Sequence, residues 1–261
     1  MLILLPPSEG KTATDAGSPF SIDALSLPEL NPKRTRVRDA LIKLCSGREK
    51  RAREVLGLSA QQSEALDRNR DLVDAHAFPA AQVYAGVLYA GLDYPTLTAA
   101  ARGRANDWIL VSSALWGAVH LDDEIPAYRL SGDVTLPRLG KNAKIWRTPL
   151  TTAMQNAAAS GVVFDLRSGV YAKMWTPHGD LSEHTAVGRV LLQRPDGSRT
   201  VVSHQNKATK GFLVRALVSQ SSTPGSVEAL ATQIEKVGFT TELSPGSDGK
   251  PWSLDVVVDE V

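Results

Sequence analysis

Two apolar, β-branched segments, residues 185–193 and 199–204, constrain the fold most because a tight turn joins them. The connection holds Pro195, Asp196 and Gly197 in succession, a combination typical of a turn between strands. Strands joined in this way run antiparallel. Any sheet that contains this predicted hairpin therefore cannot be wholly parallel.

Apolar periodicity elsewhere predicts strands and helices that interleave along the whole chain. Expected strands cover residues 2–5, 108–112, 162–166, 169–174, 240–243 and 252–258. Expected helices cover residues 36–56, 59–75, 96–102, 146–159, 206–219 and 226–237. Strict repetition of one strand and one helix is missing, and the sequence has neither an internal repeat nor a long linker. The pattern predicts an α+β (mixed α/β) fold, a single domain over residues 1–261 with a mixed, partly antiparallel sheet surrounded by helices.

Composition and hydropathy indicate a globular cytoplasmic protein that does not bind a membrane. Of the 261 residues, 43% are hydrophobic and 22% are charged, which are typical globular values. No apolar run approaches the length of a membrane span, and the short apolar start before Pro6 is too brief for a signal peptide. The single cysteine, Cys45, excludes an internal disulfide, which fits a reducing compartment.

The most distinctive segment joins the end of the predicted hairpin to a helix that starts at Asn206. At about 100° per residue, Lys207, Lys210 and Gly211 fall on one helix face. Arg215 lies at the edge of that face. A helix start attracts anions through its free N–H groups and its dipole. The pattern is typical of a phosphate-binding helix start, where the glycine admits the phosphate closely, or of a solvated first turn on an ordinary surface helix.

The loop after the first predicted strand offers a second candidate anion site. Gly10, Lys11 and Thr12 resemble the end of a phosphate-binding loop. A Walker A motif, however, requires a glycine five residues before Gly10, where this chain has Leu5. A smaller site made of Ser8, main-chain N–H groups and Lys11 fits the same residues. The alternative is a flexible polar exit from a strand.

Tyr128 and Arg129 follow a proline, which presents them rigidly. Arginine suits bidentate contacts with phosphate or carboxylate. The alternative is a structural ion pair with the acidic residues 122–124. The aromatic side chains expected in the core rather than against a ligand are Tyr84, Tyr89, Trp116 and Trp146.

Charge is distributed unevenly, although the net charge of the chain is only +1. Residues 33–53 hold nine Lys or Arg against Asp39 and Glu49, which leaves +7 there and −6 in the remainder. Such asymmetry permits a local basic surface, with a solvated helix face as the alternative. The nine cations are Lys33, Arg34, Arg36, Arg38, Lys43, Arg48, Lys50, Arg51 and Arg53.

The histidines match no familiar metal spacing, so we expect neither a metal nor a cofactor. His178 and His184 lie six residues apart around an intervening Gly-Asp pair. Neither Ser113 nor Ser168 lies in a motif that activates a serine nucleophile. His204 is a candidate general acid or base, with a hydrogen-bonded structural histidine as the alternative.

Several stretches, in order along the chain, resemble the YaaA family of peroxide stress resistance proteins. The ordered set, rather than any one stretch, carries the resemblance, and it runs from residue 2 to about residue 217. The matching stretches are Leu4–Thr12, Val83–Tyr89, Ser113–Gly117, Ile125–Leu130, Trp146, Val163–Ser168 and Ser203–Gly211.

This resemblance implies a single cytoplasmic domain of YaaA-like fold with a positively charged cleft. It also implies a role in hydrogen peroxide stress, in limiting free intracellular iron, and in DNA binding through a helix-hairpin-helix element. The usual Gly-hydrophobic-Gly hairpin of that element is not obvious here. The nearest candidates are Tyr84–Leu92, with Gly86 and Gly91, and the region Ala114–Ala118.

Two functions fit these residues. The first is a stress protein that binds double-stranded DNA, largely independently of sequence, and limits iron-dependent oxidative damage. The second is an enzyme that acts on a small phosphorylated or nucleotide-like substrate in the same cleft, with His204 and Lys11 as its candidate catalytic groups. The third and simplest hypothesis is an iron-handling or scaffold protein without catalytic activity. The predicted DNA- or phosphate-binding residues are Ser8, Lys11, Thr12, Tyr128, Arg129, Asn206, Lys207, Lys210 and Arg215.

Overall fold

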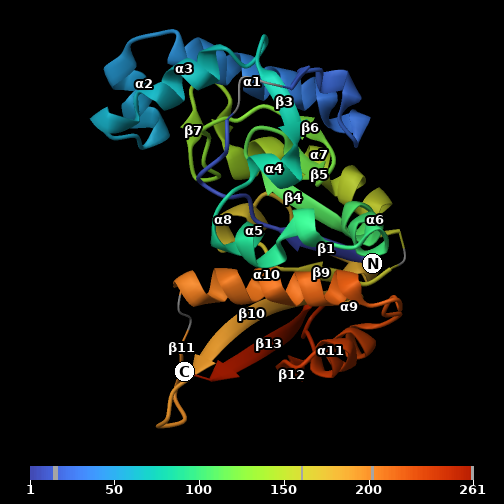
Figure 1. Cartoon of the computed structure of the whole chain (residues 1–261). Helices are drawn as coiled ribbons and strands as arrows, with labels where there is room; N and C mark the ends of the chain where they lie inside the picture. Colours follow the sequence, from blue (N-terminus) through green and yellow to red (C-terminus); the bar gives the residue numbers. More distant parts are fainter. Residues whose placement is uncertain (14–16, 160, 201–202, 260–261) are drawn as a thin grey trace.

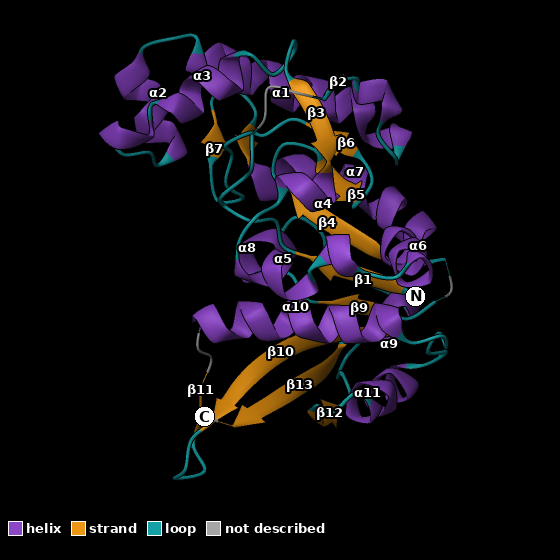
Figure 2. Cartoon of the chain, viewed as in Figure 1, coloured by secondary structure: helices purple, strands orange, loops and turns teal. Residues whose placement is uncertain are grey.

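The computed structural model describes residues 1–13, 17–159, 161–200 and 203–259, with the side chains of residues 203–205 outside that description. A mixed sheet crosses the molecule, and helices lie around it (Figures 1 and 2). In spatial order its strands are β12 (Thr240–Ser244), β13 (Trp252–Asp259), β10 (Thr185–Gln193), β9 (Val163–Asp165), β1 (Leu2–Leu5), β4 (Ile109–Ser113) and β5 (Gly117–His120), with β11 (Arg199–Thr200) beside β10.

The centre of this sheet is parallel and its margins are antiparallel. Strand β1 pairs in parallel with both β4 and β9, and β9 continues in parallel through β10 to β13. Strands β5, β11 and β12 each run antiparallel to their neighbour. All four residues of β1 are buried, as expected for a parallel strand covered on both faces. The predicted mixed, partly antiparallel sheet surrounded by helices is confirmed.

Helices α1–α3 lie at one end of the molecule, and α11 lies near β10 and β13 at the other (Figure 1). Their bounds are α1 (Asn31–Cys45), α2 (Glu49–Leu56), α3 (Glu64–Arg70), α4 (Ala80–Val83), α5 (Val87–Leu92), α6 (Ala99–Trp108), α7 (Asn142–Ala158), α8 (Gly169–Ala172), α9 (Asp180–Glu183), α10 (Ser203–Ser219) and α11 (Val227–Lys236). Short additional strands are β2 (Ser18–Pro19), β3 (His76–Pro79), β6 (Glu124–Ile125), β7 (Thr135–Leu136) and β8 (Gly140–Lys141).

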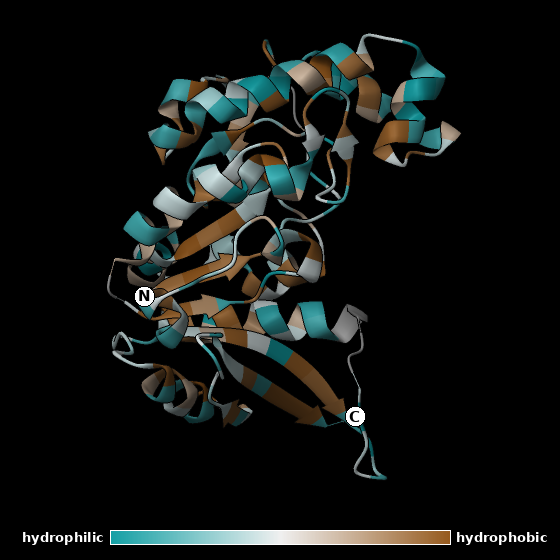
Figure 3. Ribbon diagram, turned by 180° about the vertical axis from the view of Figure 1, so that it is seen from behind, coloured by the Kyte–Doolittle hydropathy of each residue, from teal (hydrophilic) through white to brown (hydrophobic). Residues whose placement is uncertain are grey.

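The core lies between the sheet and its helices. Figure 3 shows hydrophobic strands inside the molecule and hydrophilic residues on the surrounding helices. The largest fully buried side chains include Trp116, Trp146, Tyr84 and Tyr128. Tyr84, Trp116 and Trp146 thus lie in the core, as expected. In the described part of the chain, no helix has the length and apolar character needed to cross a membrane.

Helix α10 packs between α5 and strand β10, and two glycines allow its closest approach to α5 (Figure 1). A Cβ atom added at Gly211 would lie 2.1 Å from the Leu88 carbonyl oxygen and 2.8 Å from the Leu92 nitrogen. Gly91 faces the same crossing, since its Cβ would lie 2.8 Å from the Ala208 carbonyl oxygen. The expectation that Gly211 admits a phosphate is therefore wrong: this glycine admits the backbone of α5.

The predictions for residues 169–174 and for the start of the helix at Asn206 are also wrong. Residues 169–174 were expected to form a strand, but Gly169–Ala172 is helical, because the Tyr171 and Ala172 N–H groups both donate to the Ser168 carbonyl. Helix α10 begins at Ser203 rather than Asn206, and β11 ends at Thr200. The free N–H groups of the helix start consequently precede Lys207 by about a turn.

Candidate functional site

The loop that leaves β1 is fastened to the segment between α4 and α5. The Thr12 N–H donates to the Val83 carbonyl at 2.9 Å, and the Ala85 N–H donates to Ser8 Oγ at 3.1 Å. The Ser8 hydroxyl donates onward to the Gly10 carbonyl. These contacts give the loop a defined shape, so the predicted alternative of a flexible strand exit does not describe it.

A cavity of about 430 Å³ lies between this loop and α5. Ser8 and Lys207 both line this cavity, although they are far apart in the sequence. The volume suits a small molecule and is far too small for a DNA duplex. The lining residues are Pro6, Pro7, Ser8, Glu9, Gly10, Ala85, Gly86, Val87, Leu88, Tyr89, Ser168, Tyr171 and Lys207.

Lys11 continues the same loop and places its amine against two aromatic rings. Its Nζ donates to the Ser8 carbonyl at 2.8 Å and lies 4.2 Å from the centre of the Tyr128 ring. The Tyr84 ring centre is 5.6 Å away. Burial lowers the pKa of Lys11 from 10.5 to about 7, assisted by the charges of Arg129 and Arg68 and opposed by Glu9. Near neutral pH this amine is therefore only partly protonated.

A chain of three buried hydroxyl groups lies beside Lys11. The Tyr128 hydroxyl is 2.7 Å from Ser113 Oγ and 3.1 Å from the Tyr84 hydroxyl. Burial raises the pKa of both tyrosines, so they remain neutral phenols. Ser113 Oγ also accepts the N–H groups of Leu115 and Trp116, which leaves its own proton for Tyr128.

The sequence predicted Tyr128 at this site but missed the contributions of Ser113 and Tyr84. Tyr84 was assigned to the core, and Ser113 was considered only as a nucleophile. Both residues occur in stretches that resemble the family, and this ordered resemblance was the one available signal. The Tyr128 hydroxyl contacts both side chains and so brings three segments together. Their spacing in the sequence could not predict this proximity.

Arg129 holds the loop after β1 in place through its contacts with Glu9. Its Nη1 lies 2.6 Å from Glu9 Oε2 and donates to the Glu9 carbonyl at 3.1 Å. The Arg129 main chain exchanges two hydrogen bonds with the buried Asn69 side chain. The ion pair proposed with residues 122–124 is wrong, because Asp123 accepts the main-chain N–H groups of Ser26 and His120 instead.

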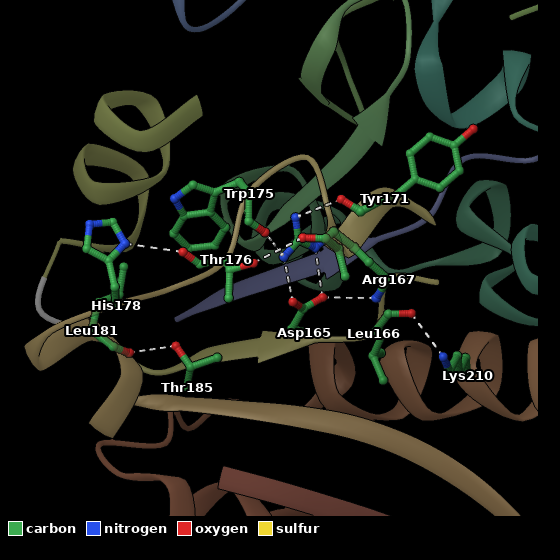
Figure 4. A network of polar contacts seen from close by, with 11 residues as sticks. Asp165, Leu166, Arg167, Tyr171, Trp175, Thr176, His178, Leu181, Thr185 and Lys210 are labelled. Atoms are coloured by element: carbon green, nitrogen blue, oxygen red, sulfur yellow. Dashed lines mark hydrogen bonds and ion pairs between the residues drawn. The ribbon is translucent and has the colours of Figure 1, made fainter. Parts of the chain in front are cut away.

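Of the four α10 residues predicted to bind phosphate, one faces the cavity and three bond within the protein. Lys207 is exposed and lines the cavity. Lys210 Nζ donates to the Leu166 carbonyl at 3.0 Å, and burial lowers its pKa (Figure 4). The remaining donors are Asn206, which bonds to the Val190 carbonyl, and Arg215, which bonds to the Leu92 and Asp93 carbonyls and to Thr96 Oγ1. Phosphate contact by these three side chains stays a prediction, and it requires exchange of these bonds.

A buried ion pair holds the cavity wall at the end of β9 (Figure 4). Arg167 Nη2 lies 2.6 Å from Asp165 Oδ2, and Arg167 Nε donates to Asp165 Oδ1 at 2.9 Å. The same guanidinium donates to the carbonyls of Tyr171 and Trp175. These bonds fix the turn that carries Ser168 and Tyr171 into the cavity lining.

One further predicted residue, Thr12, lies apart from the cavity lining. Thr12 is exposed and borders a different hollow, with Arg68, Asp71 and Ala127 among its neighbours. The His204 side chain lies outside the described residues, so its candidate role as acid or base stays a prediction.

A match to a family model accompanies this geometry. The model of the peroxide stress protein YaaA matches residues 1–243. The chain belongs to the YaaA family of peroxide stress proteins. It is 47% identical to a UPF0246 protein of Streptomyces coelicolor, with 100% of each chain covered. It is 38% identical to a UPF0246 protein of Corynebacterium efficiens, over 99% of this chain and 100% of that protein. The resemblance predicted from the ordered stretches is confirmed, and family membership supports a general role in oxidative stress.

The helix-hairpin-helix element expected in the family had two candidate positions. Residues Ala114–Trp116 form a turn between β4 and β5, so no helix flanks the second candidate, which is wrong. At the first candidate, α4 and α5 flank Tyr84–Gly86, and Gly86 has φ +110° where α5 begins. DNA contact through this pair of short helices stays a prediction.

Proposed function

We propose that this chain binds double-stranded DNA without reading its sequence, as its contribution to resistance against peroxide. The observation that carries this proposal is a group of exposed cations on α1, on α2 and in the turn between them, which we call the basic face: Arg36, Lys43, Arg48 and Lys50. Among the described residues, none of the four has a carboxylate at salt-bridge distance, whereas Arg38, Arg51 and Arg53 each have one.

The spacing on α1 supports a shared surface. Arg36 and Lys43 are seven residues apart, which places them within about 20° on the helix. Free, solvated cations are the groups that neutralise DNA phosphates and release counterions. Protein bound in this way would keep iron and peroxide from reacting at the DNA it covers, and this would limit iron-dependent damage without a metal site.

We expect binding to a duplex of about 25 base pairs to weaken steeply between 50 and 200 mM salt, with each lost phosphate contact reducing the salt slope by about one. Fluorescence anisotropy would compare the wild type with Arg36→Ala/Lys43→Ala/Lys50→Ala and with Lys207→Ala/Lys210→Ala. The first variant should reduce the slope by two to three, since it removes three contacts. A reduced slope for the second variant would assign part of the contact to the cavity side of α10.

The matched control is Lys236→Ala on α11, an exposed lysine at the other end of the molecule, which should leave the slope unchanged. Salt-insensitive binding, or no binding at 50 mM salt, would contradict the proposal. The wild type should protect plasmid DNA from nicking by ferrous iron and peroxide, and Arg36→Ala/Lys43→Ala/Lys50→Ala should not.

A second candidate function is the binding or conversion of a small phosphorylated or nucleotide-like molecule. It is favoured by the 430 Å³ cavity, whose walls combine Ser8 and Lys207 with the apolar Leu88 and the ring of Tyr89. A pocket of this size with a few convergent polar groups is the usual form of a small-molecule site.

The charge of Lys11 gives this second function a pH dependence with a defined sign. Because the pKa of Lys11 is about 7, the amine loses its positive charge between pH 6 and 8. We expect calorimetry to show AMP binding about three-fold or more weaker at pH 8.5 than at pH 7.0, where its phosphate is already largely dianionic. Lys11→Met should remove this difference, and Lys207→Ala should weaken binding at both values. Binding that strengthens with pH would contradict this role of Lys11.

A further inference from the structure

Another hollow, of about 620 Å³, lies between α7 and the segment that follows α8. Helix α7 contributes Arg147, Thr148 and Thr152, which lie within about 140° of one another on the helix surface. Residues 175–178 form the facing wall. The lining shares no residue with the 430 Å³ cavity, so the hollow is a separate candidate site.

The indole of Trp175 is the buried polar group of this hollow. Trp175 belongs to the lining and is 1% exposed, and in the described chain its Nε1–H has no hydrogen-bond acceptor. In Figure 4 the indole nitrogen points away from Arg167, toward the side on which His178 lies. A buried N–H group without an acceptor destabilises a protein. A ligand oxygen in the hollow would supply the missing acceptor.

The indole ring is held in place from its other side. Arg167 Nη2 donates to the Trp175 carbonyl at 2.9 Å, and the guanidinium carbon lies 5.4 Å from the centre of the Trp175 ring. Arg167 is itself fixed by its buried ion pair with Asp165. His178 Nδ1 donates to the Thr176 carbonyl at 3.2 Å and shapes the same wall (Figure 4). The N–H donor is therefore oriented before any ligand arrives, which lowers the entropic cost of binding.

The other polar groups of the hollow are donors and a positive charge. Arg147 is exposed, and none of the residues that line the hollow in the described chain is acidic. Thr148 and Thr152 add exposed hydroxyl groups. A guanidinium and an indole N–H can only donate hydrogen bonds, and the guanidinium fork matches a carboxylate or a phosphate. This combination favours an oxyanion over a cation.

We propose that this hollow binds the oxyanion group of a small molecule, a carboxylate or a phosphate. The indole N–H of Trp175 and the guanidinium of Arg147 are its two principal donors, and the Thr148 and Thr152 hydroxyls complete the contacts. Neither the basic face nor the 430 Å³ cavity contributes a residue. The site is therefore independent of both functions proposed above.

The test is two-dimensional ¹H–¹⁵N NMR of the labelled full chain, with the indole signals of the five tryptophans assigned on the wild type. Inorganic phosphate and acetate are titrated separately, with chloride keeping the ionic strength constant. We expect the Trp175 indole signal to move downfield and to saturate, because its N–H gains an oxygen acceptor. The anion that moves it at the lower concentration identifies the preferred group.

The other tryptophans provide internal controls. Trp146 Nε1 donates to the Ala114 carbonyl at 2.8 Å and Trp252 Nε1 to the Glu183 carbonyl at 3.1 Å, so neither signal should move. Trp116 is the matched control: in the described chain its buried Nε1 has no acceptor either, but Trp116 does not line the hollow. Equal movement of the Trp116 and Trp175 signals would overturn the proposal, as would a Trp175 signal that neither anion moves.

Two variants test the donors separately. Arg147→Met should weaken anion binding at least about five-fold, because it removes a charged donor from the exposed wall. Trp175→Phe keeps an aromatic ring against Arg167 and removes the N–H, so it should weaken binding as well, as measured from the other shifted amide signals. The control is Lys236→Met, which removes an exposed positive charge outside the lining and should change affinity less than about two-fold. Unchanged affinity in Arg147→Met would contradict the assignment.

Discussion

Arg34→Met is expected to lower the free energy of unfolding by about 3 to 5 kcal/mol, because it leaves several buried acceptors without a donor. Arg34 is fully buried, and its guanidinium donates to the carbonyls of Trp116 at 2.9 Å, Ala118 at 2.7 Å and Ser26 at 2.7 Å. It also donates to Asn31 Oδ1 at 2.8 Å. Burial lowers the pKa of Arg34 to about 10, so the group remains charged at neutral pH.

Urea unfolding followed by circular dichroism would measure this loss. The matched control is Arg36→Met, two residues along the same helix, where the side chain is exposed and the expected change is within about 0.5 kcal/mol. A loss below about 1 kcal/mol for Arg34→Met would show that water replaces the guanidinium without strain. Comparing the two variants also distinguishes two roles of the cations in residues 33–53: Arg34 stabilises the fold, whereas Arg36 faces solvent.

Gly211→Ala is expected to destabilise the protein by about 3 kcal/mol, through overpacking rather than loss of a contact. Both atoms that its Cβ would meet, the Leu88 carbonyl oxygen at 2.1 Å and the Leu92 nitrogen at 2.8 Å, belong to the α5 backbone. A backbone atom cannot rotate away, so α5 and α10 must separate. Because Leu88 and Lys207 line the cavity, AMP binding should weaken as well.

Gly103→Ala in α6 is the control for this substitution. A Cβ added at Gly103 meets no atom within 4 Å, so alanine should stabilise the helix by about 0.5 to 1 kcal/mol. Thermal and urea unfolding of the two variants should therefore shift in opposite directions. Equal stability of Gly211→Ala and the wild type would show that the crossing of α5 and α10 is loose.

Elements with strong local signals were predicted well from the sequence. The strand at residues 2–5 is confirmed at its predicted bounds, because a four-residue apolar run before two prolines permits little else. The turn at Asp196 and Gly197 joins antiparallel strands, as its residues require. Residues 169–174 carried no such signal, and the contacts of Arg167 and Ser168 decided their conformation.

The candidate site was predicted only in part. The sequence pointed to Ser8, Lys11 and Lys207, and the fold brings Ser8 and Lys207 to one cavity, with Lys11 in the loop that forms its wall. It could not show that Lys210 and Arg215 use their donors on main-chain carbonyls. Helical periodicity gives the face on which a residue lies, but it does not give the element that packs against that face.

By itself, the sequence determined the mixed sheet, the family and the loop and helix that carry the site, because turns, apolar runs and ordered stretches are local properties of the chain. Only the tertiary structure decided the state of Lys11. The Tyr128 and Tyr84 rings, the Ser8 carbonyl and the charges of Arg129 and Arg68 reach its amine from separate segments. A pKa depends on burial and on charges through space, and these exist only once the chain has folded.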